Sequence, residues 1–314
     1  MVASGCDKAK EFVRAGRASG PPQVAPAEEL DLSANPDIVF QVFGEASDPR
    51  MIPVASIRGG ELQPIVLSEG GWRRFDARYL RRGKSYALYQ DGRVSGSVEV
   101  ARGMWESAGD PLYVLPNCHT LTPLAAVRVA DGHPRTGFTV ELIASTARLG
   151  SQRRTATLPH GELVRIAREA AAEAGPGVHI TLKTLDSLDF HAESFVSGAS
   201  AAPTVVASFI DPAAEGARSP GTVTTHILVI ADRDSTGAYH VTYAHRLHGP
   251  LGTASFRRYF DHLDLTGDGV DEIILEGWPY GGDTFLSVLG WKDGRWREVF
   301  RTRPNWCLDE RQGN

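Results

Sequence analysis

Short runs of β-branched and aromatic residues recur along this chain, and turn-forming Gly, Pro or Asp-Gly residues separate them. Runs of this length and composition are typical of strands, and short turns between them favour antiparallel pairing. The clearest hairpin signal is Asp91-Gly92, between the strand-like runs 85–90 and 93–100. Further strands are predicted at 38–43, 51–57, 62–67, 112–115, 124–129, 138–144, 178–182, 204–210, 222–231, 239–246, 273–278, 285–291 and 295–301.

Helical spacing of apolar residues occurs in few places. Residues 72–80 have apolar or aromatic side chains at 72, 75, 79 and 80, which predicts a short helix. A better helix begins at Pro159-His160, and Gly175-Pro176-Gly177 ends it. The polar or small stretches 183–203 and 211–221 are predicted to be loops. The predicted class is α+β and β-rich, with mostly antiparallel sheets and two or three short helices.

The 314 residues suffice for one large or two medium domains. Residues 1–35 are rich in Pro and Ala and too poor in large apolar side chains to pack, so they are predicted to form a flexible tether. We expect a β-rich N-terminal domain at 36–150 and an α+β C-terminal domain at 151–314. The two lobes are expected to divide between residues 145 and 200.

Charge and hydropathy exclude some classes of partner. The net charge is −5, so the chain lacks the broad basic excess that nucleic-acid binding requires. No run of about 18 apolar residues is present, so no transmembrane helix is predicted. A local basic run between Arg73 and Lys84 is interpreted as a solvated helix face. Contact with anionic lipid or a cell-envelope polymer is the alternative.

The three cysteines differ in context. Val2-Ala3-Ser4-Gly5-Cys6 resembles the bacterial lipobox, which implies lipidation at Cys6 and an extracytoplasmic protein whose only membrane contact is the anchor. An ordinary N-terminus is the alternative. Cys118 and Cys307 would then remain as a candidate disulfide, which such a compartment permits. Two buried free thiols are the other interpretation.

An acidic loop at residues 264–272 is the strongest candidate site. Side-chain oxygens fall at 264, 266, 268 and 272, and Gly269 allows a tight bend. Calcium takes about six to eight oxygen ligands, some of which can be water. A turn that binds no ion is the alternative, and Asp271 is expected to point away. The predicted calcium ligands are Asp264, Thr266, Asp268, the Val270 carbonyl and Glu272.

An EF-hand is excluded because its twelfth position requires Glu, whereas this chain has Leu275 within an apolar strand signal. Over about residues 258–301 the pattern resembles the calcium loops of FG-GAP and VCBS-type repeats, found in integrin-like β-propellers. The resemblance implies a structural ion at the entry of a strand. Family propellers carry many such loops, and this chain has one, so a complete propeller is not expected.

Other signals of chemistry are weaker. Asp186, Asp189 and Glu193 lie near His191 and could supply a carboxylate pair for glycoside hydrolysis, but solvated acids are the commoner case. Histidines 240, 245 and 248 lack a zinc-ligand pattern. The aromatic residues Trp278, Tyr280, Trp291 and Trp296 are interpreted as core, with an exposed platform for a sugar or protein as the alternative.

These observations favour an exported cell-envelope protein that binds a protein or glycan partner and is not an enzyme. The alternative is a hydrolase of extracellular or envelope polymer with a calcium-stabilised lobe. A deep pocket with converging carboxylates or histidines would favour the enzyme. A flat aromatic surface would favour binding.

Overall fold

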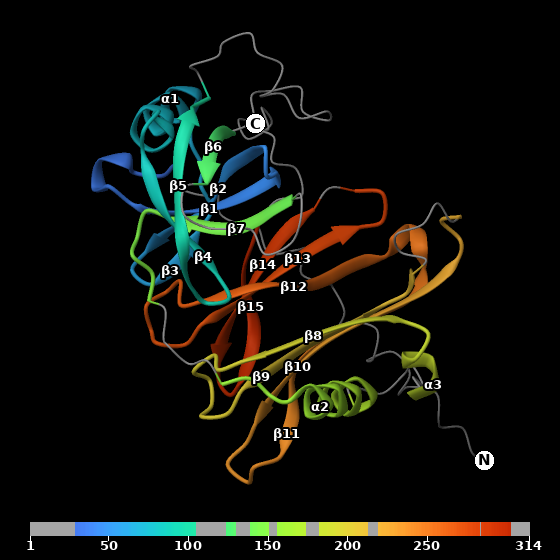
Figure 1. Ribbon diagram of the computed structural model, residues 1–314. Helices are drawn as coiled ribbons and strands as arrows, with labels where there is room; N and C mark the ends of the chain where they lie inside the picture. The colour runs from blue at the N-terminus through green and yellow to red at the C-terminus, as the bar shows by residue number, and fades with distance from the viewer. Residues whose placement is uncertain are drawn as a thin grey trace, which may run out of the picture.

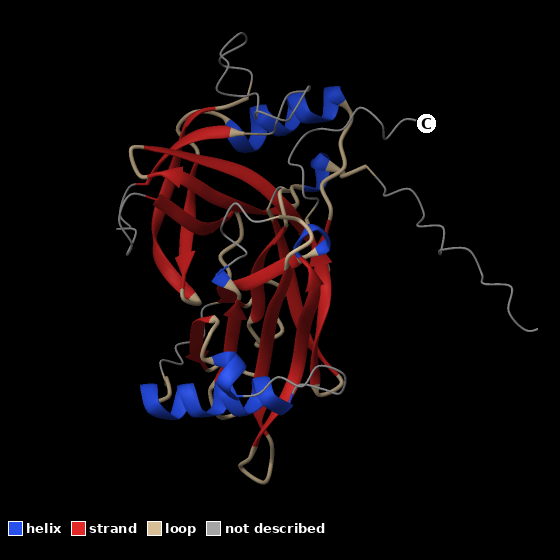
Figure 2. Ribbon diagram, turned by 90° about the vertical axis from the view of Figure 1, so that its right-hand side faces the viewer, coloured by secondary structure: helices blue, strands red, loops and turns tan. Residues whose placement is uncertain are grey.

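The computed structural model describes residues 29–104, 124–129, 139–150, 156–173, 182–212, 219–282 and 284–302. All three cysteines lie outside these ranges, as do the predicted strand at 112–115 and all but the last residue of that at 178–182. A barrel, two sheets and a helical layer make up the described molecule (Figure 1, Figure 2). Within it, no helix is both long and apolar enough to cross a bilayer.

Six strands close into an antiparallel barrel in which β1 pairs with both β7 and β2. A short strand, β3 (Glu61–Gln63), extends the sheet beyond β2. The order around the barrel is β1 (Asp37–Glu45), β7 (Thr139–Ser145), β4 (Ser85–Gln90), β5 (Arg93–Arg102), β6 (Ala125–Val129) and β2 (Asp48–Arg58).

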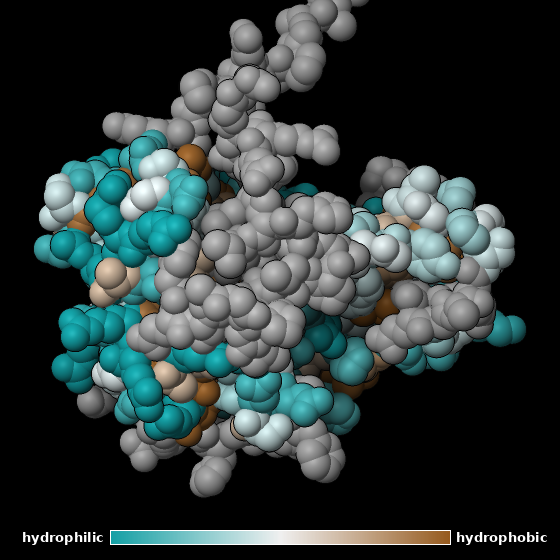
Figure 3. Space-filling model, turned by 90° about the horizontal axis from the view of Figure 1, so that it is seen from above, coloured by the Kyte–Doolittle hydropathy of each residue, from teal (hydrophilic) through white to brown (hydrophobic). Residues whose placement is uncertain are grey.

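Alternation along β1 explains how the barrel is filled. Ile38, Phe40 and Val42 point into its core, whereas Val39 between them belongs to a second apolar cluster outside. One helical segment packs on this core through Trp72 and other apolar side chains. It consists of α1 (Glu69–Phe75) and η2 (Asp76–Leu80), and the short η1 (Leu32–Ala34) lies beside α1. Seen from above, the described barrel side of the molecule is mainly hydrophilic (Figure 3).

The rest of the described chain forms two four-stranded antiparallel sheets. The first has the order β11 (Tyr239–Pro250), β10 (Val223–Arg233), β9 (Thr204–Ile210), β8 (Asp189–Phe195). The second is a meander in chain order: β12 (Ser255–Leu263), β13 (Glu272–Pro279), β14 (Phe285–Lys292), β15 (Arg295–Arg301). Three short segments complete the fold: α2 (His160–Glu173), α3 (Leu182–Leu185) and η5 (Leu251–Thr253).

Apolar contacts stack these units in layers. The helix α2 covers the outer face of the first sheet, where Leu163 and Ile166 pack with Phe209. The inner face of that sheet packs on the second sheet, which in turn packs on the barrel. The second sheet is thus buried on both faces, which explains why Ile273-Ile274-Leu275 in β13 shows no polar alternation. This stacking leaves β8 and β12 as neighbouring edge strands.

Much of the predicted secondary structure is confirmed, including the β-rich antiparallel character and the two helices. The hairpin at Asp91-Gly92 is also confirmed, with positive φ angles of 51° and 70°. Two predictions are wrong: residues 183–203 contain α3 and β8, and the α+β class does not describe a closed barrel. The strand β12 was not predicted, and the domain bounds 36–150 and 151–314 stay a prediction.

Candidate functional site

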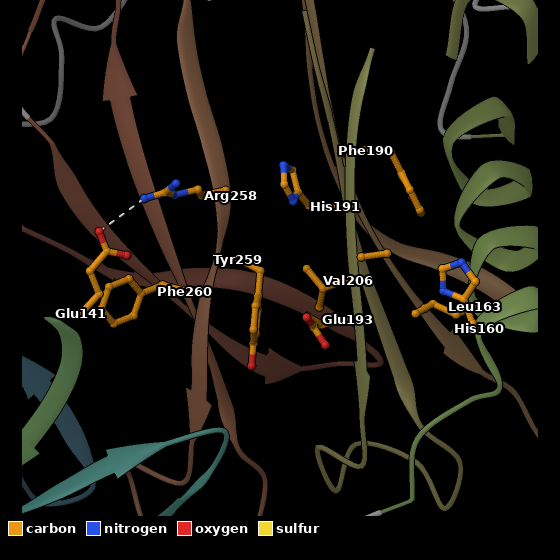
Figure 4. Close-up of a pocket in the computed structure, with 11 residues that line it drawn as sticks. Glu141, His160, Leu163, Phe190, His191, Glu193, Val206, Arg258, Tyr259 and Phe260 are labelled. Carbon is orange, nitrogen blue, oxygen red and sulfur yellow. Dashed lines mark ion pairs between the residues drawn. The ribbon is translucent and has the colours of Figure 1, made fainter. Parts of the chain in front are cut away.

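A pocket of about 480 Å³ lies between the edge strands β8 and β12 (Figure 4). Its lining includes the consecutive residues 190–193 of β8 and 258–260 of β12. Successive side chains of a strand point to opposite faces of the sheet. A cavity that touches every residue of such a run therefore lies along the edge of the strand and not over one face.

Both strands present an edge to this pocket. In the described part of the chain, β8 pairs only with β9, and β12 only with β13. An edge strand of this kind presents backbone N–H and C=O groups that a further strand can bind. The β12–β13 register shifts between Tyr259 and Asp261, so Phe260 is an extra residue that forms a β-bulge. Bulges bend the strand that carries them and are common at sheet edges.

Side chains from other elements close the pocket on two sides. His160 and Leu163 of α2 lie on one side, and Glu141 of the barrel strand β7 lies on the other (Figure 4). Arg258 of β12 is 3.6 Å from Glu141, and its Nε donates to Glu276 at 2.6 Å. The Arg258 guanidinium is therefore held between two carboxylates, and Glu141 is already engaged by a cation.

Tyr259 and the exposed Glu193 contribute polar groups to the lining. The Tyr259 hydroxyl is 2.6 Å from Nδ1 of His262, whose ring stacks on Phe195 with centroids 3.7 Å apart. Burial raises the pKa of Tyr259 well above its usual value. Burial also raises the pKa of Glu193, and Asp91 adds to this rise. The site thus contains one carboxylate that would gain from a cationic partner.

The barrel hairpin locks the far side of β12 in place. Gly92 N donates to Asp261 Oδ1 at 3.3 Å, and a Cβ on Gly92 would lie 2.5 Å from His262 Nε2. Glycine is therefore required at this position both for its positive φ and for the close approach. Burial raises the pKa of Asp261 to about 7. This contact fixes β12 next to the pocket.

The acidic loop forms a tight turn that satisfies its own carboxylates. Asp264 is buried, and its two oxygens accept from Gly267 N at 2.7 Å and Gly269 N at 3.2 Å. Glu272 accepts from Leu265 N and from the Thr266 hydroxyl, each at 2.8 Å. The remaining members of the predicted ligand set lie at the surface side of the turn, where Asp268 accepts from Val270 N at 2.8 Å.

The oxygen atoms of this turn are of the kind that calcium prefers as ligands, but they do not converge on one coordination site. Among the described residues, no group of three or more His, Cys, Asp or Glu side chains is placed to hold a metal ion. Burial raises the pKa of Glu272 to about 7, and a bound cation would oppose that rise. Calcium at this loop therefore stays a prediction, as does the FG-GAP likeness. The exclusion of an EF-hand is supported, because Leu275 is fully buried in β13.

Most other predicted candidates do not meet at a site. Asp186 pairs with Arg168 at 2.7 Å and is not among the residues that line the pocket, so the proposed carboxylate group is divided. His245 bonds the Ser255 carbonyl at 3.2 Å. Asp271, expected to point away from the loop, is buried with Oδ2 3.8 Å from His262 Nε2. The candidate lipidation at Cys6 and the candidate disulfide Cys118–Cys307 lie outside the described residues.

Sequence reasoning named Glu193 and His191 but placed them in a loop, and it did not identify Arg258 or Tyr259. A signal was present in β8, where Phe190 and Ala192 alternate with polar residues. This alternation has the period of a strand, but its apolar half is too weak to stand out.

Searches of protein-family models, curated proteins and solved structures give no significant match to this chain.

Proposed function

We propose that this protein is a non-enzymatic binding module that takes an extended peptide segment of a partner protein between β8 and β12. The observation that carries the proposal is the pocket lined by consecutive residues of two edge strands. An extended peptide can add to a sheet edge as a further strand. Its backbone hydrogen bonds then supply affinity, and pockets for its alternate side chains supply specificity.

The two sides of the pocket differ in chemistry, which supports a preference in the peptide. Leu163, Phe190 and Val206 offer an apolar surface near α2. Glu193 forms no ion pair with any residue in the described ranges, and burial raises its pKa. A peptide that alternates apolar with basic side chains would match both surfaces. A Lys or Arg next to Glu193 would favour the ionised carboxylate and return its pKa toward the usual value.

The hydrolase alternative has less support. The pocket is not a flat aromatic surface, and its carboxylates and histidines do not converge. Glu141 and Glu193 lie on opposite sides of Tyr259 (Figure 4), and Glu141 is engaged by Arg258. Acid–base hydrolysis of a glycoside requires two carboxyl groups that flank one bond with one of them free to donate a proton. The arrangement therefore favours binding over catalysis.

An extracytoplasmic location is part of the proposal and rests on the lipobox-like run that ends at Cys6. It can be tested by expressing the chain from its native genomic region and fractionating the cells. Membrane association that Cys6→Ser abolishes would support the anchor. Recovery of the unchanged protein in the cytosol would contradict it.

The binding proposal can be tested with a phage-displayed library of random linear peptides selected on the full chain. An enriched peptide is synthesised with a fluorophore, and its Kd is measured by anisotropy. Glu193→Lys places a cation in the pocket between β8 and β12, where it would repel a basic side chain of the peptide. It should weaken binding at least about tenfold, which corresponds to about 1.4 kcal/mol. The matched control is Glu61→Lys on β3, an exposed position at the end of the barrel sheet, which makes the same change of charge away from the pocket.

The two variants separate edge binding from general effects of charge. Unchanged affinity in Glu61→Lys together with the loss in Glu193→Lys supports the site. Failure of any peptide to enrich, or equal weakening in both variants, would overturn it. Circular dichroism of both variants checks that the sheets are intact.

A further inference from the structure

A second hollow, of about 790 Å³, lies on the barrel side of the molecule between the segment 29–33 and the helical turns of α1 and η2. It is lined by other elements than the peptide pocket. Four cationic side chains line it, and we call it the arginine hollow: Arg74, Arg78, Arg81 and Lys84. These cations gather here although the chain as a whole carries a net charge of −5.

The carboxylates of the two acidic residues in the same lining accept hydrogen bonds from nearby serine residues. Glu29 Oε1 accepts from Ser68 N at 3.0 Å and from Ser68 Oγ at 2.8 Å. These hydrogen bonds lower the pKa of Glu29, with a smaller contribution from Arg74. Asp31 Oδ1 accepts from Ser33 N at 2.8 Å. Both carboxylates therefore hold the wall of the hollow and do not neutralise its cations through ion pairs.

The cations themselves are placed for an external anion. Arg78 donates to the Leu32 carbonyl, which ties the helical turn to the opposite wall. Arg74, Arg81 and Lys84 are exposed and form no ion pair with any residue that the structure describes. Trp72, Phe75 and Leu80 anchor the same turns in the barrel core. The helical turns that carry Arg74 and Arg78 are therefore anchored on the barrel core, while the charged groups of Arg74, Arg81 and Lys84 are available to a ligand.

We propose that the arginine hollow binds a phosphate group that carries close to two negative charges. Four cations and two carboxylates leave a net charge of about two positive, and a phosphate monoester carries about −1.5 to −2 near neutral pH. Guanidinium groups bind two oxygens of one phosphate through parallel N–H donors, and Lys adds a point charge. A single carboxylate would leave the hollow with uncompensated positive charge.

The same chemistry is presented by a soluble phosphate compound and by a lipid headgroup. The experiment therefore uses the full chain with two probes. Inorganic phosphate is titrated by calorimetry, and sedimentation measures binding to phosphatidylcholine vesicles with and without phosphatidic acid. The test variant is Arg74→Ala with Arg81→Ala. The control, Lys292→Ala with Arg295→Ala, removes the same charge from exposed positions in the β14–β15 hairpin.

The proposal expects at least about tenfold weaker binding of one probe in the test variant, because each charged hydrogen-bonding partner contributes roughly one order of magnitude. The control variant should keep wild-type affinity. Arg74→Lys with Arg81→Lys should bind with intermediate affinity, since it keeps the charge but loses the planar donors. Binding of inorganic phosphate identifies a soluble ligand, and vesicle binding alone identifies a headgroup. Absence of binding to both probes, or equal loss in test and control variants, overturns the proposal.

Discussion

The buried His226 should make the protein lose stability on mild acidification. His226 lies on β10 with no exposed surface, and its Nε2 is 2.8 Å from the Arg257 carbonyl. Its Nδ1 has no hydrogen-bond partner among the described residues. Burial, with the neighbouring His245, lowers its pKa from 6.5 to about 3. The folded protein thus holds this imidazole neutral at a pH where the unfolded chain protonates it.

The size of the effect follows from linkage. A group with a lowered pKa contributes full stability above its unfolded pKa, and this contribution is lost as pH falls from 6.5 toward 3. Between about pH 7.5 and about pH 5, the imidazole is protonated in the unfolded chain but neutral in the folded protein over an interval of close to one and a half pH units. The free energy of unfolding should therefore fall by about 2 kcal/mol from this group alone.

Urea denaturation at the two pH values can isolate this term. His226→Gln keeps a side-chain N–H near the Arg257 carbonyl but cannot titrate. Between about pH 7.5 and about pH 5, the free energy of unfolding should fall by about 2 kcal/mol less in His226→Gln than in the wild-type protein. The exposed His248 on β11 provides the control variant His248→Gln. The reasoning fails if His226→Gln follows the same pH profile as wild type.

Two further predictions concern the barrel contact and the acidic loop. Gly92→Ala should destabilise the protein by about 2–4 kcal/mol in urea denaturation, because the new Cβ meets His262. The control Gly83→Ala, at a glycine with positive φ but open space around it, should lose only about 1 kcal/mol. Equal losses in the two variants would contradict the clash. If the loop holds calcium, millimolar calcium raises the melting temperature and Asp264→Ala with Asp268→Ala abolishes the rise, whereas melting curves that calcium leaves unchanged would rule the ion out.

Two of the strands that sequence reasoning found most directly lie in the interior of a sheet. Residues 204–210 and 273–278 are runs of apolar residues, because both faces of each strand are covered. The hairpin at Asp91-Gly92 was equally accessible, since both turn residues adopt the positive φ that this dipeptide tolerates. Local chemistry decides these features, so a single sequence suffices to predict them.

The two strands that form the candidate site were missed for a related reason. Edge strands face solvent along one side and carry charged residues that discourage aggregation, so β8 and β12 include His191, Glu193 and Arg258. Their polarity hides the strand period. Closure of the barrel was also out of reach, because β1 and β7 are separated by about a hundred residues and pair through contacts that no local pattern encodes. The acidic loop was found because its spacing is local.

The second sheet is covered on one face by the barrel and on the other by the first sheet. Each half of the molecule therefore shields apolar surface of the other half from water. A fragment that ends after β7 would expose Val39, Tyr89 and Ile143 to water. A fragment that starts at α2 would likewise expose Ile274 and Val288. Each fragment would present an exposed apolar surface that favours aggregation. Proteolytic release of either half should therefore yield precipitate and not two soluble domains.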